Sequence, residues 1–191
     1  NAGREPFAKA AASQLGDRLR RFGLRRVGQT IADLGQVARS VESVRNPEAQ
    51  HELLAGRVET MISEIALALR DATKDIPKNE SQARAIANEE AFNAQQHKLI
   101  AAARAHGELL QWEAFTEALE QISDPATHQV MTWLRDLFGL GLIETNAAWY
   151  LVQGRISGQR AEAVTAYVDR LIGRLRHHAL DLVESFGFTP E

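Results

Sequence analysis

Apolar residues recur along most of this chain at intervals of three and four positions. That spacing places side chains on one face of an α-helix, whereas β-strands alternate apolar and polar residues with a period of two. Ala, Leu, Arg, Glu and Gln, which are good helix formers, dominate the sequence. The pattern predicts an all-α protein.

Cap residues predict where the helices begin and end. Asn46-Pro47 and Asp124-Pro125 each combine a side chain that accepts hydrogen bonds from the first free N–H groups with a proline that needs no donor there. Gly154 is expected to end one helix and Ser157 to cap the next. These signals predict long helices near residues 47–73, 81–122, 125–152 and 158–185, with two shorter ones over 5–22 and 27–44. We expect a bundle of about four long antiparallel helices plus the two shorter N-terminal helices.

Two of these segments show where the core should lie. Residues 137–143 are apolar on every side, so the helix that contains them should be surrounded by others. Gly139 and Gly141 lack the preceding strand and the full glycine fingerprint of a phosphate loop, which favours close helix packing. The last helix carries one apolar stripe that should face a single side, made of Val164, Val168, Leu171, Leu175, Ala179, Leu182 and Phe186.

Composition limits the chemistry that the chain can perform. The 191 residues are 45% apolar and include no cysteine, which excludes thiol catalysis, Cys-ligated zinc and iron–sulfur chemistry. The longest unbroken apolar stretches are far too short to cross a bilayer, so we expect a soluble protein. Charge is uneven, because residues 1–46 hold nine Lys/Arg and four Asp/Glu within a chain of net charge −3.

Candidate catalytic and metal-binding groups are sparse. None of the six histidines is paired with another at the three- or four-residue spacing of a helical metal site. Glu113 and Glu117 share a helix face, as acid–base catalysis would need, but nothing nearby in the sequence identifies a nucleophile or an orienting partner. Trp112, Trp133, Trp149 and Tyr150 suit either the core or an interface. We expect no catalytic residue and no metal ligand here.

One basic face is a candidate binding surface. Arg18, Arg21 and Arg25 lie on one side of a predicted helix, and arginine's planar fork suits phosphate. A nucleotide, a coenzyme A tail or nucleic acid could dock there, whereas a solvated face or an interface with acidic helices is the simpler interpretation. The acidic remainder of the chain and the absence of a helix-turn-helix signature disfavour nucleic acid.

Several short segments, taken in order, are similar to those of a known family. They are Asn46 to Gln50 running to Arg57 and Ala68, Ala91 to Ala94, Ala101 to His106, Asp136 to Leu140, Gly154 to Ser157 and Leu171 to Phe188. Over roughly residues 46–188 the chain resembles the C-terminal helical domain of acyl-CoA oxidases. The resemblance divides the chain into residues 1–45, an N-terminal helical segment that is a linker or the end of a catalytic core, and the helical domain 46–191.

The resemblance implies a role in fatty-acid β-oxidation. The complete enzyme would use FAD to convert a fatty acyl-CoA to the trans-2-enoyl-CoA and would reoxidise the flavin with O2 to give H2O2. The family's Tyr-Glu-Gly-like catalytic motif is missing from this sequence. We therefore expect the chain to be an accessory and dimerisation domain that forms part of a homodimer, packs on a separate catalytic core and alone binds no FAD tightly.

Two further expectations complete the sequence-based interpretation. The alternative function is a stand-alone all-α ligand-binding or dimerisation module whose basic N-terminal face meets a phosphate-bearing partner. The final Thr189-Pro190-Glu191 differs from a peroxisomal Ser-Lys-Leu-type address, which predicts a bacterial cytoplasmic enzyme.

Overall fold

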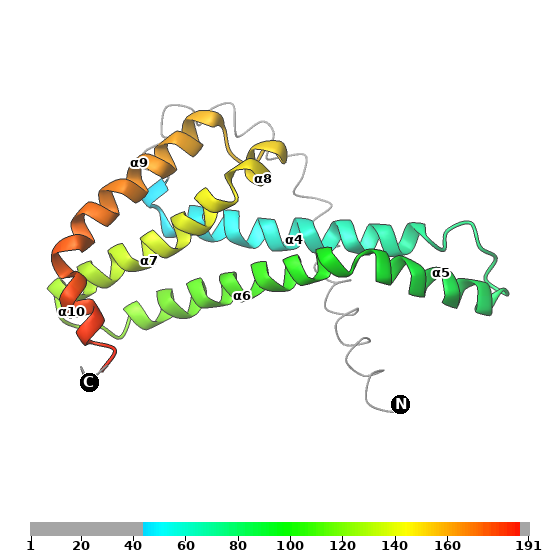
Figure 1. The fold of residues 1–191 in the computed structure, drawn as a ribbon, viewed down its shortest axis with the longest axis horizontal. Helices are drawn as coiled ribbons and strands as arrows, with labels where there is room; N and C mark the ends of the chain where they lie inside the picture. The colour runs from blue at the N-terminus through cyan, green and yellow to red at the C-terminus, as the bar shows by residue number, and fades with distance from the viewer. Residues whose placement is uncertain (1–43, 188–191) are drawn as a thin grey trace. The chain divides into compact units, whose positions relative to one another are not determined.

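The structure, a computed structural model, describes residues 44–187, and every regular element in that range is helical (Figure 1). The elements are α4 (Pro47–Asp71), α5 (Ser81–Ala94), α6 (Gln96–Leu119), α7 (Pro125–Thr145), α8 (Ala147–Val152), α9 (Gly158–Leu175), the 3₁₀ turn η3 (Arg176–His178) and α10 (Ala179–Glu184). The all-α prediction is confirmed. The shorter helices predicted over 5–22 and 27–44 lie outside the described residues.

The predicted caps are present. Side-chain oxygens of Asn46, Asp124 and Ser157 accept hydrogen bonds from first-turn backbone N–H groups at 2.8, 2.7 and 3.2 Å. Gly154 has a φ of 62°, a left-handed conformation that glycine adopts without strain, and it follows the end of α8. Local side-chain chemistry therefore sets these helix ends as the sequence indicated.

Three of the four predicted long helices are broken once. The segment 81–122 bends at Gln95, 125–152 at Asn146, and 158–185 at η3. At Asn146 the side-chain amide donates to the carbonyl oxygen of Leu142 at 2.7 Å, which competes with the regular helical hydrogen bond. The predictions of uninterrupted helices there were wrong.

Helix α7 lies at the centre of the described residues. It packs against α4, α6 and α9, and α4 and α6 run side by side along much of their length (Figure 1). Leu140 and Ile143 of α7 are each 1% exposed. The prediction that other helices surround the apolar segment 137–143 holds for Gly139, Leu140 and Ile143, which are buried, whereas Leu137 and Phe138 remain partly exposed.

The stripe on the last helix is buried over only part of its length. Val164, Val168, Leu171 and Leu175 lie in the core, but Ala179 is exposed and Phe186 is 73% exposed. The 3₁₀ turn η3 has about three residues per turn instead of 3.6, so the residues after it are rotated away from the direction of the first half. The prediction that all seven residues face one side was wrong for Ala179 and Phe186, which are exposed, whereas Leu182 is partly buried.

Gly139 permits the closest approach of α7 to its neighbours. A Cβ atom at this position would lie 2.4 Å from Nε1 of Trp112 and 2.8 Å from Oε1 of Gln50. No such contact exists at Gly141, where nothing lies within 4 Å of an added Cβ. For Gly139, helix packing is thus the correct interpretation rather than a phosphate loop.

These two glycines give a matched test of the packing. We expect Gly139→Ala to lower the free energy of unfolding by about 1–3 kcal/mol, because the methyl group forces the Trp112 ring or α7 to move. Gly141→Ala, in the same helix, should raise it by up to about 1 kcal/mol through helix propensity. Urea unfolding of both variants measures the difference, and equal effects would contradict the close approach at Gly139.

Candidate functional site

A buried polar network connects α4, α6 and α7. The amide nitrogen of Gln50 donates to the carbonyl oxygen of Val44 at 3.1 Å and to Oδ1 of Asp136 at 3.3 Å. Its amide oxygen accepts a hydrogen bond from Nε1 of Trp112 at 3.3 Å. Gln50 is 1% exposed, so these three bonds replace those that water would supply. The Gln50 amide thereby links α4, α6 and α7 to one another and to the Val44 carbonyl that precedes α4.

Arg135 completes this network. Its Nε and Nη2 atoms lie 3.0 and 2.8 Å from Oδ1 of Asp136, and its guanidinium carbon is 5.4 Å from the centroid of the Trp112 ring. Burial raises the pKa of the Asp136 carboxyl, although the positive charge of Arg135 and the hydrogen bond from Gln50 act in the opposite direction. Both ionisable side chains are almost fully buried, so each depends on the other for its charge compensation.

A second polar cluster joins α4 to α8 and the loop after it. Nη2 of Arg155 donates to Oγ1 of Thr60 at 2.9 Å, and the hydroxyl of Tyr150 donates to the carbonyl oxygen of Leu53 at 3.2 Å. Tyr150 is completely buried, and this burial raises the pKa of its hydroxyl. The segment Gly154 to Ser157, which carried part of the family resemblance, therefore holds the α8–α9 connection against α4.

Of the two carboxylates considered for acid–base catalysis, Glu113 is paired with a histidine of α4. Oε1 of Glu113 lies 2.7 Å from Nε2 of His51, and the His51 ring packs 5.8 Å from the Trp112 ring. Glu117 is exposed on the same helix. Within residues 44–187 no group of three or more His, Cys, Asp or Glu side chains is placed to hold a metal ion.

The aromatic residues considered as interface anchors belong to the core. Trp112 is 3% exposed and Tyr150 is fully buried, while Trp133 and Trp149 pack against the core with part of their surface exposed. The exposed apolar surface comes from other residues, namely Leu67, Ile86, Phe92, Ile100, Leu110, Leu151, Val152, Ile172, Leu180, Val183 and Phe186. The candidate face of Arg18, Arg21 and Arg25 lies outside the described residues and stays a prediction.

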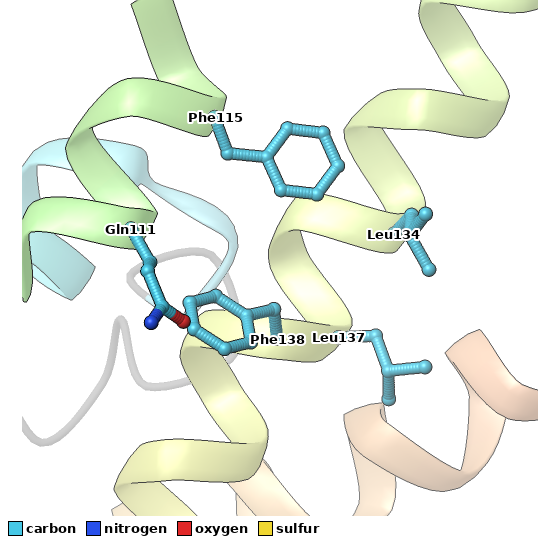
Figure 2. A pocket seen from close by; sticks show the side chains of 5 residues that line it. All are labelled: Gln111, Phe115, Leu134, Leu137 and Phe138. Carbon is cyan, nitrogen blue, oxygen red and sulfur yellow. The ribbon is translucent and has the colours of Figure 1, made fainter. Parts of the chain in front are cut away.

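An open apolar groove lies between α6 and α7 (Figure 2). Its volume is about 440 Å³, and its lining is Gln111 and Phe115 of α6 with Leu134, Leu137 and Phe138 of α7. Gln111 supplies the only polar side chain in this lining, and none of the five can ionise. The groove is therefore suited to burying apolar side chains of a partner and supplies no acid, base or nucleophile.

The groove and the network were both missed from the sequence alone. A signal for the network was present, because Asp136 stands directly before an apolar segment that was expected to be surrounded by helices. A carboxylate in that place requires buried partners. The groove had no comparable signal, since its residues are ordinary apolar positions of two separate helices.

The fold and the site define an all-α domain with an interior fixed by polar networks and an exterior that carries an apolar groove. None of the helices described between residues 44 and 187 has the length and apolar character needed to span a bilayer. The sequence pattern of the acyl-CoA oxidase family matches residues 56–191. The chain belongs to this family, and its resemblance to the family's C-terminal helical domain is confirmed.

Two mammalian proteins are similar to part of this chain. Peroxisomal acyl-coenzyme A oxidase 2 of Oryctolagus cuniculus is 38% identical over 104 residues, which cover 53% of this chain and 15% of the relative. The protein of the same name in Mus musculus is 35% identical over 92 residues, covering 47% of this chain and 13% of the relative. The matched segments are thus a small part of each relative.

These relatives overturn the predicted location. A bacterial cytoplasmic enzyme was expected, but the similar proteins are peroxisomal by name and come from rabbit and mouse. The expectation relied on the last three residues of the chain. A targeting address is read at a protein's natural terminus, so those residues were a poor basis for the prediction.

Asp136 gives the network a testable pH dependence. The pKa of the Asp136 carboxyl is raised above 3.8 in the folded protein, whereas in the unfolded chain it has the ordinary value of 3.8. At a pH between these two values, the folded protein keeps a proton on Asp136 and the unfolded chain has released it. The carboxyl therefore contributes most stability below pH 3.8 and loses this contribution as pH rises through the native pKa. Asp136→Asn removes the effect.

Urea unfolding across a series of pH values provides the measurement. The wild type should gain stability relative to Asp136→Asn as the pH is lowered from neutral towards 3.8. Asp75→Asn, which alters an exposed loop carboxylate, serves as the control. Parallel pH profiles for wild type and Asp136→Asn would contradict the raised pKa.

Proposed function

We propose that residues 46–191 form the C-terminal accessory and dimerisation domain of an FAD-dependent acyl-CoA oxidase whose catalytic core lies outside this chain. The complete enzyme converts a fatty acyl-CoA to the trans-2-enoyl-CoA in fatty-acid β-oxidation. In it, FAD accepts the hydrogen removed from the substrate and is reoxidised by O2 to give H2O2.

The family match over residues 56–191 carries this proposal. The segments aligned with the two relatives account for only 15% and 13% of the length of those relatives, so most of such an enzyme lies beyond the part matched here. A helical domain that makes up so small a share of an oxidase is expected to support the remainder rather than to perform the reaction alone.

The exterior of the domain supports a docking role. The α6–α7 groove presents Phe115, Leu134, Leu137 and Phe138 around a hollow of about 440 Å³ (Figure 2). Leu180 and Val183 of α10 are 69% and 59% exposed. Apolar side chains from a catalytic core or from a second subunit would gain free energy by covering these surfaces.

The α6–α7 groove offers a flavin few polar partners. A bound FAD needs partners for its pyrophosphate, and the lining of the groove has no cation and only the Gln111 amide as a polar side chain. In this proposal the contribution of the chain is mechanical. The Gln50 and Arg155 networks hold α4, α6, α7 and α8 in a fixed arrangement, which keeps the docking surface in one shape.

The purified chain tests the proposal directly. We expect it to lack visible flavin absorbance and acyl-CoA-dependent peroxide formation, and to gain both only when a flavin-binding acyl-CoA oxidase core is supplied. Light scattering should show association of this chain with the core and a dimeric complex. Stoichiometric FAD with acyl-CoA turnover in the chain alone would show that it is a complete enzyme, and failure to bind the core would overturn the accessory role.

A further inference from the structure

Three arginines gather beside the start of α4 and along one flank of α9. The guanidinium carbons of Arg45 and Arg170 lie 4.9 and 5.7 Å from the centroid of the Tyr167 ring. That of Arg174 lies 5.4 Å from the centroid of the Trp133 ring. Arg174 follows Arg170 by four residues, so both side chains project from the same flank of α9. We call Arg45, Arg170 and Arg174 the basic row.

No carboxylate lies within ion-pair distance of the basic row in the part of the chain that the structure describes, although the positive charge of Arg45 acts to lower the pKa of the buried Asp136 carboxyl. Arg57 and Arg135 form ion pairs with Glu108 and Asp136, but no Asp or Glu oxygen among residues 44–187 lies within 4.0 Å of the three arginines. All three are exposed. Within the row, Nε of Arg170 donates to the carbonyl oxygen of Ala166 at 3.1 Å, which fixes that side chain along the helix.

Contact with the aromatic rings makes these arginines suitable for recognition. A guanidinium that packs on a ring interacts through its face and keeps N–H groups at its edge for a carboxylate, which it can bind with two parallel hydrogen bonds. Holding the side chain on the ring also reduces the conformational entropy that is lost on binding. The row is therefore an anion-binding surface that is partly ordered before its partner arrives.

We propose that the basic row docks an acidic surface of the flavin-binding core of the same enzyme. This inference rests on the proposed function and identifies the surface through which the domain is oriented on the core. Arg45 lies at the start of the described helical unit, next to where the preceding polypeptide joins it. The matched segment is 15% of the rabbit relative, so a large part of such an enzyme is available to supply carboxylates.

Charge and shape favour an acidic protein surface over other anions. The row spans a helix flank and contributes nothing to the lining of the α6–α7 groove, which suits an extended partner better than one small phosphate. Residues 1–46 hold nine Lys/Arg and four Asp/Glu, so they offer the row little negative charge. Residues 47–191 hold 13 Lys/Arg and 21 Asp/Glu, and this acidic balance repels nucleic acid.

Charge reversal at the row tests the inference. The full chain, as wild type or as Arg170→Glu/Arg174→Glu, is titrated onto the separately expressed flavin-binding core by calorimetry. We expect the double variant to bind at least about tenfold more weakly, and wild-type binding to weaken as salt is added. The matched control is Arg70→Glu/Arg104→Glu, which makes the same charge change at exposed positions of α4 and α6 and should alter affinity by less than about twofold.

A conservative variant guards against loss of folding. Arg170→Lys/Arg174→Lys keeps the charge but loses the planar fork, so its affinity should fall between those of the wild type and the charge-reversed variant. Circular dichroism checks that each variant keeps its helices. Equal binding by wild type and a folded Arg170→Glu/Arg174→Glu chain would overturn this inference while leaving the accessory role intact.

Two other outcomes have distinct meanings. No binding of the wild-type chain to the core would overturn the proposed function and this inference with it. In the second outcome, the Arg170→Glu/Arg174→Glu variant loses binding to duplex DNA or inorganic phosphate while its binding to the core is unchanged. That result would show that the partner of the basic row is a phosphate and not an acidic protein surface.

Discussion

The arrangement of the helices depends on the side-chain amide of Gln50. Its nitrogen reaches the Val44 carbonyl and the Asp136 carboxylate, and its oxygen accepts from the Trp112 indole, so one buried group satisfies polar atoms from three separate parts of the chain. A buried donor or acceptor that loses its partner costs about 1–3 kcal/mol. The amide therefore permits only a narrow range of positions for α4, α6 and α7.

The dependence extends to the neighbouring residues. Gly139 must lack a side chain because Trp112 and Gln50 occupy the space beside it, and Asp136 can remain buried only with Arg135 and Gln50 close by. Further along α4, Arg155 donates a hydrogen bond to Thr60 and Tyr150 donates one to the carbonyl oxygen of Leu53. Because α4 takes part in both clusters, the polar contacts hold this helix in one register against the rest of the bundle.

The sequence correctly predicted the helix ends that are set by side chains within one turn. Asn46, Asp124 and Ser157 act within one helical turn, and their caps were found in place. The break at η3 and the groove depend on packing between distant segments, for which a single sequence offers little signal. Asp136 lies between these cases, since an acidic residue beside a segment expected in the core indicates a buried partner, but not that the partner is Gln50, 86 positions away.

The exterior combines two kinds of surface that act differently in association. Apolar side chains around the α6–α7 groove favour burial against a partner whatever its orientation, because the hydrophobic effect has no direction. The arginines of the basic row gain most from carboxylates at defined positions, so they favour one orientation. The proposed docking on a flavin-binding core in a single pose would use both surfaces, and a rigid interior keeps the two surfaces at a constant separation.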